Sequence, residues 1–228
     1  GRRSSSTLPI ESELVVTENA PIVYIVDDDE RIREALSDLL ESHSMPAVTF
    51  GSAGAYIGAS KPDLPACLVL DIELPDINGL ELQAQIADGD HPPIVFITGH
   101  GDIPSSVRAL KRGAVDFLTK PFSDSDLMTA IRSAIARDKA ARAVRAELSV
   151  LNQRYLGLTP REREVMPLVV SGLLNKQAAA ELKISEVTLQ IHRRNVMQKM
   201  EATSLAELVR FAEKLQIPVR RSRRTGSA

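Results

Sequence analysis

The chain has 228 residues, 43% of them hydrophobic and 25% charged, with a formal net charge of −2 at pH 7, and this length allows one large domain or two small ones. Its single cysteine, Cys67, excludes an intramolecular disulfide framework and favours a reducing compartment, so we expect a cytoplasmic protein. The sequence contains no apolar stretch near the roughly 18 residues of a membrane helix and no signal peptide at its start, so we expect no membrane contact.

Charge is distributed unevenly along the chain. Residues 1–149 hold 14 Lys and Arg against 23 Asp and Glu, whereas residues 150–228 hold 14 against 7. An acidic half joined to a basic half predicts two domains, and we expect the basic half to bind an anionic partner, nucleic acid first. At the two ends, residues 1–20 are rich in Ser, Thr and charge and predict a disordered leader, while residues 218–228 are rich in Arg and predict a basic flexible tail.

The acidic half alternates strand-like runs with helical patterns, which predicts a parallel sheet covered on both faces. We therefore expect a doubly wound α/β domain with a (βα)5 order over residues 21–136. Beyond it, residues 137–154 combine strong helix formers with charge and lack an apolar stripe, so they predict a semi-rigid helical linker. The strands are expected at 22–26, 47–50, 67–70, 94–97 and 115–118, and the helices at 30–42, 52–59, 78–87, 103–112 and 124–147.

Charged side chains follow several of these strands. The run Asp27-Asp28-Asp29 comes after the first strand, Asp71 ends the third, and Lys120 comes after the last. Ligands of open α/β folds bind outside the carboxyl ends of the strands. The pattern therefore predicts a cation site beside a phosphorylatable aspartate. The alternative, a solvated acidic loop with an unrelated surface lysine, does not explain why these signals occur at successive strand ends.

The residue types indicate Mg2+ as the cofactor, because this hard cation takes oxygen ligands and keeps several waters. We expect Asp28 and Asp71 to bind it directly, Asp27 to act through water, and the Glu73 carbonyl to complete the protein ligands. Phosphoryl transfer depends on positioning and charge neutralisation. Lys120 is expected to neutralise one phosphoryl oxygen, and the hydroxyl of Thr98, at the end of the fourth strand, to donate a hydrogen bond to another.

The first 140 or so residues resemble the receiver domain of two-component systems. The resemblance is carried by Val-Asp-Asp-Asp at 26–29, by Asp71 followed by Leu-Pro-Asp-Ile-Asn-Gly at 74–79, by Thr-Gly-His-Gly at 98–101, and by Lys-Pro-Phe at 120–122. It implies that Asp71 accepts a phosphoryl group from a sensor histidine kinase and that Thr98 and Phe117 transmit the change. It also implies a cis Lys120–Pro121 bond, which only an X-Pro sequence readily permits.

The basic half predicts an all-α, four-helix domain over residues 155–217. Thr159, Pro160 and Glu162 have the spacing of a capping box at the start of a helix. Two short helices across a tight turn at 183–184, the second beginning after Ser185, are typical of a helix-turn-helix. We expect the four helices at 160–172, 175–182, 186–200 and 205–215, the last beginning after Ser204.

The helix at 186–200 is the candidate recognition helix. We expect Val187, Ile191 and Val196 to face the core. Gln can pair with adenine and Arg with guanine in the major groove, whereas Lys more often contacts phosphates. His192 is either a DNA contact or a packed structural residue. The candidate DNA-binding residues are Lys176, Thr188, Gln190, His192, Arg193, Arg194 and Lys199.

Residues 158–212 resemble the DNA-binding domain of the LuxR/NarL/FixJ regulators, through Leu-Thr-Pro-Arg-Glu-Arg-Glu at 158–164, Ile-Ser-Glu at 184–186 and Ala-Glu-Leu-Val-Arg at 206–210. With the receiver-like half, the chain resembles a FixJ-type response regulator. The resemblance implies a phosphorylation-activated transcription regulator whose partners are a sensor histidine kinase, promoter DNA, RNA polymerase and a second copy of the chain. Phe117 and Val107 belong either to the core or to a dimer face exposed by phosphorylation, and both assignments can hold in different states.

Two other functions compete with this one. A phosphatase-like enzyme would use Asp71 as its covalent nucleophile and Glu73 as its acid-base group, but it gives the basic half no purpose. A receiver that only docks onto proteins is disfavoured for the same reason.

Overall fold

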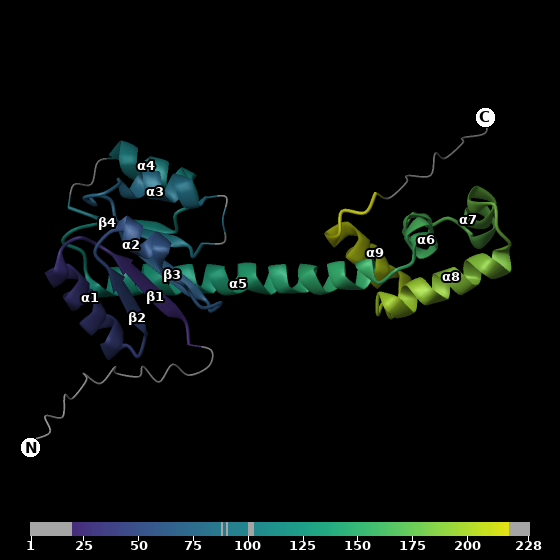
Figure 1. The fold of residues 1–228 in the computed structure, drawn as a ribbon, viewed down its shortest axis with the longest axis horizontal. Helices are drawn as coiled ribbons and strands as arrows, with labels where there is room; N and C mark the ends of the chain where they lie inside the picture. Colours follow the sequence, from purple (N-terminus) through teal and green to yellow (C-terminus); the bar gives the residue numbers. More distant parts are fainter. Residues whose placement is uncertain (1–19, 88, 90, 100–102, 219–228) are drawn as a thin grey trace, which may run out of the picture. The chain divides into compact units, whose positions relative to one another are not determined.

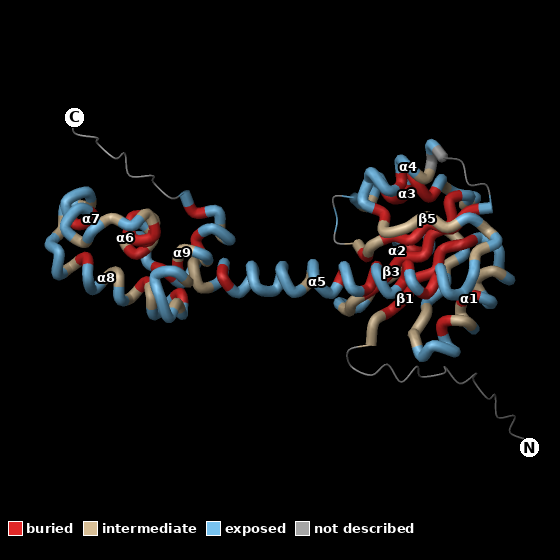
Figure 2. The backbone as a smooth tube through the Cα atoms, turned by 180° about the vertical axis from the view of Figure 1, so that it is seen from behind, coloured by how far each residue is buried: buried red, intermediate tan, exposed pale blue. Residues whose placement is uncertain are grey.

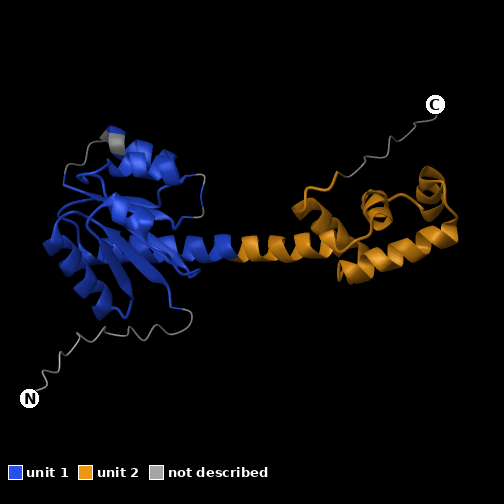
Figure 3. Cartoon of the chain, in the orientation of Figure 1, with its two compact units in different colours: residues 1–142 blue, residues 143–228 orange. Residues whose placement is uncertain are grey.

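The computed structural model describes residues 20–87, 89, 91–99 and 103–218. The predicted leader and tail, and the His100-Gly101 part of one motif, therefore lie outside the described residues, apart from Ala20 and Pro218. The chain divides into two compact units, residues 1–142 and 143–228 (Figure 3).

The first unit is a parallel sheet with the strand order β2-β1-β3-β4-β5 (Figure 1). Its apolar strand residues alternate between the two faces, as the pleat requires. One face packs against α2, α3 and α4, and the other against α1 and α5, which confirms the doubly wound α/β class. The strands are β1 (Ile22–Val26), β2 (Ala47–Phe50), β3 (Ala66–Asp71), β4 (Ile94–Thr98) and β5 (Asp116–Thr119), and the helices are α1 (Glu30–Ser42), α2 (Ala53–Gly58), α3 (Gly79–Ile86), α4 (Ile103–Lys111) and α5 (Asp124–Leu156).

The three central strands are buried along their whole length, because both faces of the sheet are covered (Figure 2). β2 is an edge strand and is only partly buried. Ser123 accepts a hydrogen bond from the Asp126 amide at 3.1 Å and so caps α5, as predicted.

Helix α5 stays packed on the first unit beyond the predicted end of that domain. Asp138 is 2% exposed, and its carboxylate accepts a hydrogen bond from the buried amide of Ala66 at 2.9 Å. Arg142 is bonded to Asp138 and also paired with Asp63. The first residues of the stretch predicted as a linker therefore belong to the packed unit, and the two units divide after Arg142.

The described residues of the second unit contain the last part of α5 and four further helices, as predicted. Thr159 forms the predicted capping box with Glu162, and Ser185 and Ser204 cap the helices that follow them. Lys183 adopts a left-handed conformation (φ 54°) in the predicted turn. The helices are α6 (Pro160–Val170), α7 (Asn175–Leu182), α8 (Glu186–Lys199) and α9 (Leu205–Lys214). Among the residues that the structure describes, no helix is both long enough and apolar enough to cross a membrane.

Candidate acidic site and helix-turn-helix surface

The acidic site lies where the strand order reverses. β1 and β3 are adjacent although β2 separates them in sequence, and Val26 pairs with Leu70. Asp27 and Asp71, one residue further along each strand, are thereby brought side by side at the carboxyl edge of the sheet. The start of α3 packs closely on this edge because its first residue is Gly79, where an added Cβ atom would lie 2.4 Å from the Asp71 carbonyl oxygen.

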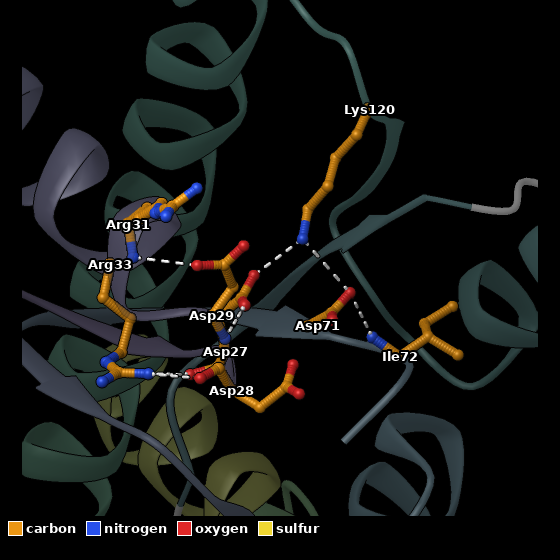
Figure 4. A network of polar contacts seen from close by, with 8 residues as sticks. All are labelled: Asp27, Asp28, Asp29, Arg31, Arg33, Asp71, Ile72 and Lys120. Atoms are coloured by element: carbon orange, nitrogen blue, oxygen red, sulfur yellow. Dashed lines mark hydrogen bonds and ion pairs between the residues drawn. The ribbon is translucent and has the colours of Figure 1, made fainter. Parts of the chain in front are cut away.

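Three carboxylates and one ammonium converge at this edge (Figure 4). The Lys120 Nζ lies 2.7 Å from Asp27 Oδ2 and 3.6 Å from Asp71 Oδ1. Asp27 and Asp71 are buried, whereas Asp28 is exposed at the rim. One carboxylate oxygen from each of the three aspartates lies within 4.8 Å of the others. The sequence-predicted cluster is thus assembled in space, and the Lys120–Pro121 bond is cis, as the resemblance implied.

Burial raises the pKa of Asp71 above its ordinary value, and the neighbouring charges of Asp27 and Asp28 act in the same direction. Lys120 and the amide of Ile72, which donates to Asp71 Oδ1 at 3.0 Å, oppose this rise in pKa. Such a carboxylate is poorly hydrated and has two further negative charges near it, which Lys120 offsets only in part. A cation placed among the three aspartates removes that repulsion.

The donor set fits a hard divalent cation. Three carboxylates within reach of one another, one of them exposed to solvent, suit Mg2+, which needs few protein ligands. The side chain of Glu73 is exposed, and the role of its carbonyl as a ligand stays a prediction.

The two predicted switch residues lie on neighbouring strands. Thr98 is fully buried at the end of β4, and its carbonyl accepts a hydrogen bond from the Lys120 amide at 2.7 Å. Phe117 on β5 is half-buried, and its ring centroid lies 6.4 Å from that of Phe96. Thr98 therefore lies on the strand next to the one that ends in Asp71, and Phe117 lies on the strand that Lys120 follows.

In the second unit, α8 is rotated from the orientation that we predicted. Leu189, Val196 and Met200 are fully buried, whereas Val187 is 66% and Ile191 55% exposed. The buried set has the spacing i, i+7, i+11 and forms one face of the helix. The prediction that Val187 and Ile191 face the core was wrong, and that of Val196 was confirmed.

The rotation divides the candidate DNA-binding residues into two groups. Gln190, Arg194 and Lys176 are exposed and form no hydrogen bond or ion pair among the described residues, whereas Lys199 is exposed but paired. Four others have contacts within the unit or are partly covered by it. Arg193 is half-buried and donates to Asn175 Oδ1 at 3.2 Å, and Thr188 shares a hydrogen bond with Ser185. Lys199 is bonded to the buried Glu162 at 2.7 Å. His192 is half-buried, and its buried Nδ1 has no partner among the described residues.

Both halves match known families. The family profile of the response regulator receiver domain matches residues 23–132, and that of the luxR family of bacterial regulatory proteins matches residues 156–212. The chain belongs to the response regulators with a LuxR-type DNA-binding domain. This response regulator is 46% identical to nodulation protein W of Bradyrhizobium diazoefficiens over 90% of each chain. It is 42% identical to the transcriptional regulatory protein FixJ of Azorhizobium caulinodans, over 83% of this chain and 90% of that one.

Two solved structures of regulators resemble this response regulator. The response regulator StyR is 45% identical, with a TM-score of 0.77 over 86% of this chain and 99% of that one. Full-length FixJ from B. japonicum is 40% identical, with a TM-score of 0.51 over 88% and 99%. The predicted order of a receiver followed by a helix-turn-helix domain is thereby confirmed.

Proposed function

We propose that this response regulator is switched on by phosphorylation of Asp71 and then binds promoter DNA through α8. An Asp71 oxygen attacks the phosphorus of a phosphohistidine on a sensor histidine kinase. A P–O bond forms, the P–N bond breaks, and the imidazole leaves on the kinase. The observation that carries this proposal is the buried Asp71 carboxylate, grouped with two further aspartates and Lys120, in a chain that also contains a helix-turn-helix.

The neighbours of Asp71 divide the remaining work. Mg2+, when bound, supplies positive charge to the transferring phosphoryl oxygens. We assign Asp28 and Asp71 as its direct ligands, Asp27 as a ligand through water and the Glu73 carbonyl as a further ligand. Lys120, now paired with Asp27, is close enough to Asp71 to turn toward a phosphoryl oxygen. The Thr98 hydroxyl donates a hydrogen bond to another oxygen.

Replacing Asp28 by Ala is expected to weaken Mg2+ binding by about 10-fold and to slow phosphorylation at limiting Mg2+, because a hard ligand is lost. Calorimetric titration of the full chain measures the affinity. A Glu30→Ala variant is the control, since it removes one exposed acidic charge from the first turn of α1 without touching the three-carboxylate group. Equal affinities in Asp28→Ala and Glu30→Ala would remove Asp28 from the ligand set.

Phosphorylation adds roughly 1.5 to 2 negative charges at neutral pH, so the site must rearrange to neutralise them. We propose that Thr98 moves toward the phosphoryl group and Phe117 turns inward. The adjacent α4–β5 face, on which Val107 and Leu110 are 42% and 46% exposed, then binds a second copy of the chain. Two DNA-binding units can in this way engage half-sites related by two-fold symmetry.

We propose that the outward face of α8 reads DNA bases. The exposed residues Gln190 and Arg194 offer donors for adenine and guanine, and the exposed Val187 and Ile191 offer apolar contact for the thymine methyl group. Lys176 contacts phosphate. Thr188, Arg193 and Lys199 are bonded to other residues of the unit and hold the helix in place, and His192 is half-buried. The site of action is the cytoplasm, where promoter DNA and RNA polymerase are its further partners.

A coupling experiment tests the apolar part of this face. Replacing operator thymines by uracil removes only the 5-methyl group, and at a thymine contacted by Ile191 it should cost the native protein about 1 kcal/mol of binding energy. The Ile191→Ala variant should bind both operators with similar affinity, which shows up as a coupling energy in a double-mutant cycle. Leu205→Ala truncates an exposed apolar residue on α9 and should show no coupling. Independent effects of Ile191 and the methyl groups would exclude the contact.

The phosphatase-like alternative finds no support in the comparisons. FixJ and StyR are named as regulators, and the second half of the chain has a LuxR-type domain that an aspartyl-phosphate hydrolase does not need. The exposed side chain of Glu73 does not favour an acid-base role at Asp71 either.

A further inference from the structure

Arg33, one turn into α1, reaches back to the end of β1. Its Nη1 donates to the carbonyl oxygen of Asp27 at 2.8 Å and to that of Asp28 at 2.9 Å (Figure 4). The guanidinium is half-buried over Gly51, where an added Cβ would lie 3.5 Å from Nη1. One nitrogen thus bridges two consecutive carbonyls next to the acidic site.

This bridge shows that the main chain turns between Asp27 and Asp28. Consecutive carbonyls of a strand point to opposite edges, so both can meet one donor only where the chain has left the strand. Asp27 is still held as part of the sheet, because its amide donates to the Phe50 carbonyl at 3.2 Å. The turn at Asp28 brings its exposed carboxylate to the group formed with Asp27 and Asp71. Arg33 holds that turn by drawing together two oxygens that otherwise repel each other.

We propose that Arg33 is a positioning residue for Mg2+, which fixes the main chain of Asp28 so that its carboxylate is presented to the cation. The inference rests on the proposed function, since it concerns the same metal site. Residues that orient a ligand through a hydrogen bond change metal affinity by about 10- to 100-fold when they are removed.

The positive charge of Arg33 and its hydrogen bonds have opposite effects on Mg2+ affinity, so the direction of the change in affinity tests the proposal. A cation near the site repels Mg2+, so removing the charge alone would strengthen Mg2+ binding. Loss of positioning weakens it. Replacing an arginine that only lies on the surface of α1 would therefore strengthen Mg2+ binding, whereas replacing a positioning arginine would weaken it.

The experiment measures Mg2+ affinity of the full-length, unphosphorylated protein by calorimetry, with Mn2+ and electron paramagnetic resonance as a second probe, because the chain has no tryptophan to report binding by fluorescence. Arg33→Met keeps much of the length and removes both hydrogen bonds. Arg33→Lys keeps the charge and offers one nitrogen that can donate to both carbonyls. Arg31→Met is the matched control, since it removes the same charge from an exposed position two residues away. Thermal melting establishes that each variant is folded at the assay temperature, and Arg33→Gln replaces Arg33→Met if that variant is not.

We expect Arg33→Met to bind Mg2+ about 10-fold more weakly than the native protein, Arg33→Lys to recover most of this loss, and Arg31→Met to bind at least as tightly as the native protein. Unchanged or tighter binding by Arg33→Met would overturn the inference, as would equal losses in the Met and Lys variants. If the native protein itself fails to bind Mg2+, or if Asp28→Ala binds it normally, the proposed metal site fails, and that result is seen before any Arg33 variant is compared.

Discussion

An Asp71→Asn variant is expected to take up no phosphoryl group from a small phosphoryl donor or from a phosphorylated kinase. The amide has the same size as the carboxylate but lacks the negatively charged nucleophilic oxygen, so labelling should fall to background while the fold is kept. Asp71 is 5% exposed, and its Oδ1 accepts the Ile72 amide at 3.0 Å, a bond that the oxygen of asparagine can retain. Because the charge increase at the site cannot occur, phosphoryl donors should also leave the DNA affinity of this variant unchanged.

Labelling with a radioactive donor, with hydroxylamine sensitivity as the mark of an acyl phosphate, measures the first effect, and a gel-shift titration measures the second. Asp38→Asn is the control, because it makes the same substitution at an exposed position on α1. Undiminished, hydroxylamine-sensitive label in Asp71→Asn would move the acceptor to another carboxylate, with Asp27 and Asp28 the next candidates.

Lys199→Met is expected to destabilise the DNA-binding unit by about 2 kcal/mol without changing the salt dependence of DNA binding, because the lysine pairs with a buried carboxylate. Its Nζ lies 2.7 Å from Oε2 of Glu162, whose side chain is 3% exposed. Lys176→Met is the matched variant, since Lys176 is also exposed but forms no ion pair among the described residues. It should leave stability nearly unchanged and reduce the slope of log affinity against log salt by about 0.9.

The same pair predicts how the stability of the unit depends on pH. Burial alone would raise the pKa of Glu162, but hydrogen bonds from Lys199 and Thr159 outweigh it and lower the pKa from 4.5 to about 2. Because the folded-state pKa is depressed, the contribution to stability is complete above pH 4.5 and is lost as the pH falls toward 2. Lys199→Met should show a smaller loss over this range. Thermal melting between pH 2 and 7 tests both statements, and a flattened salt slope in Lys199→Met would restore its role as a phosphate contact.

The acidic site could be predicted because it follows from local patterns. In a parallel sheet every strand end lies at a common edge, so Asp27, Asp71, Thr98 and Lys120 can be placed there from strand boundaries alone. The pattern could not predict which of the charged side chains are bonded to one another. Lys120 bonds Asp27 more closely than Asp71, and Arg33 binds main-chain carbonyls, which no side-chain motif records.

The recognition helix shows the opposite case. Val187 and Ile191 are β-branched and apolar, which predicts a place in the core, although Leu189, Val196 and Met200 already form a complete apolar face at helical spacing. Exposed apolar residues on a basic helix are expected where the partner itself has apolar groups. The Lys199–Glu162 pair joins residues 37 positions apart and depends on how α6 and α8 pack, which the sequence alone does not show.

The bond between Asp138 and Ala66 determines where this protein can be cut. A fragment or a chimera that ends the receiver at Ala136, where its apolar helical pattern stops, would lack Asp138. Among the described residues this is the only acceptor shown for the buried amide of Ala66, and its loss would also expose the start of β3. An unpaired buried amide costs about 1–3 kcal/mol. Fusion proteins that exchange receiver domains between regulators of this kind should therefore be joined after Arg142, so that Asp138 and Arg142 stay in the same protein as the sheet that they contact.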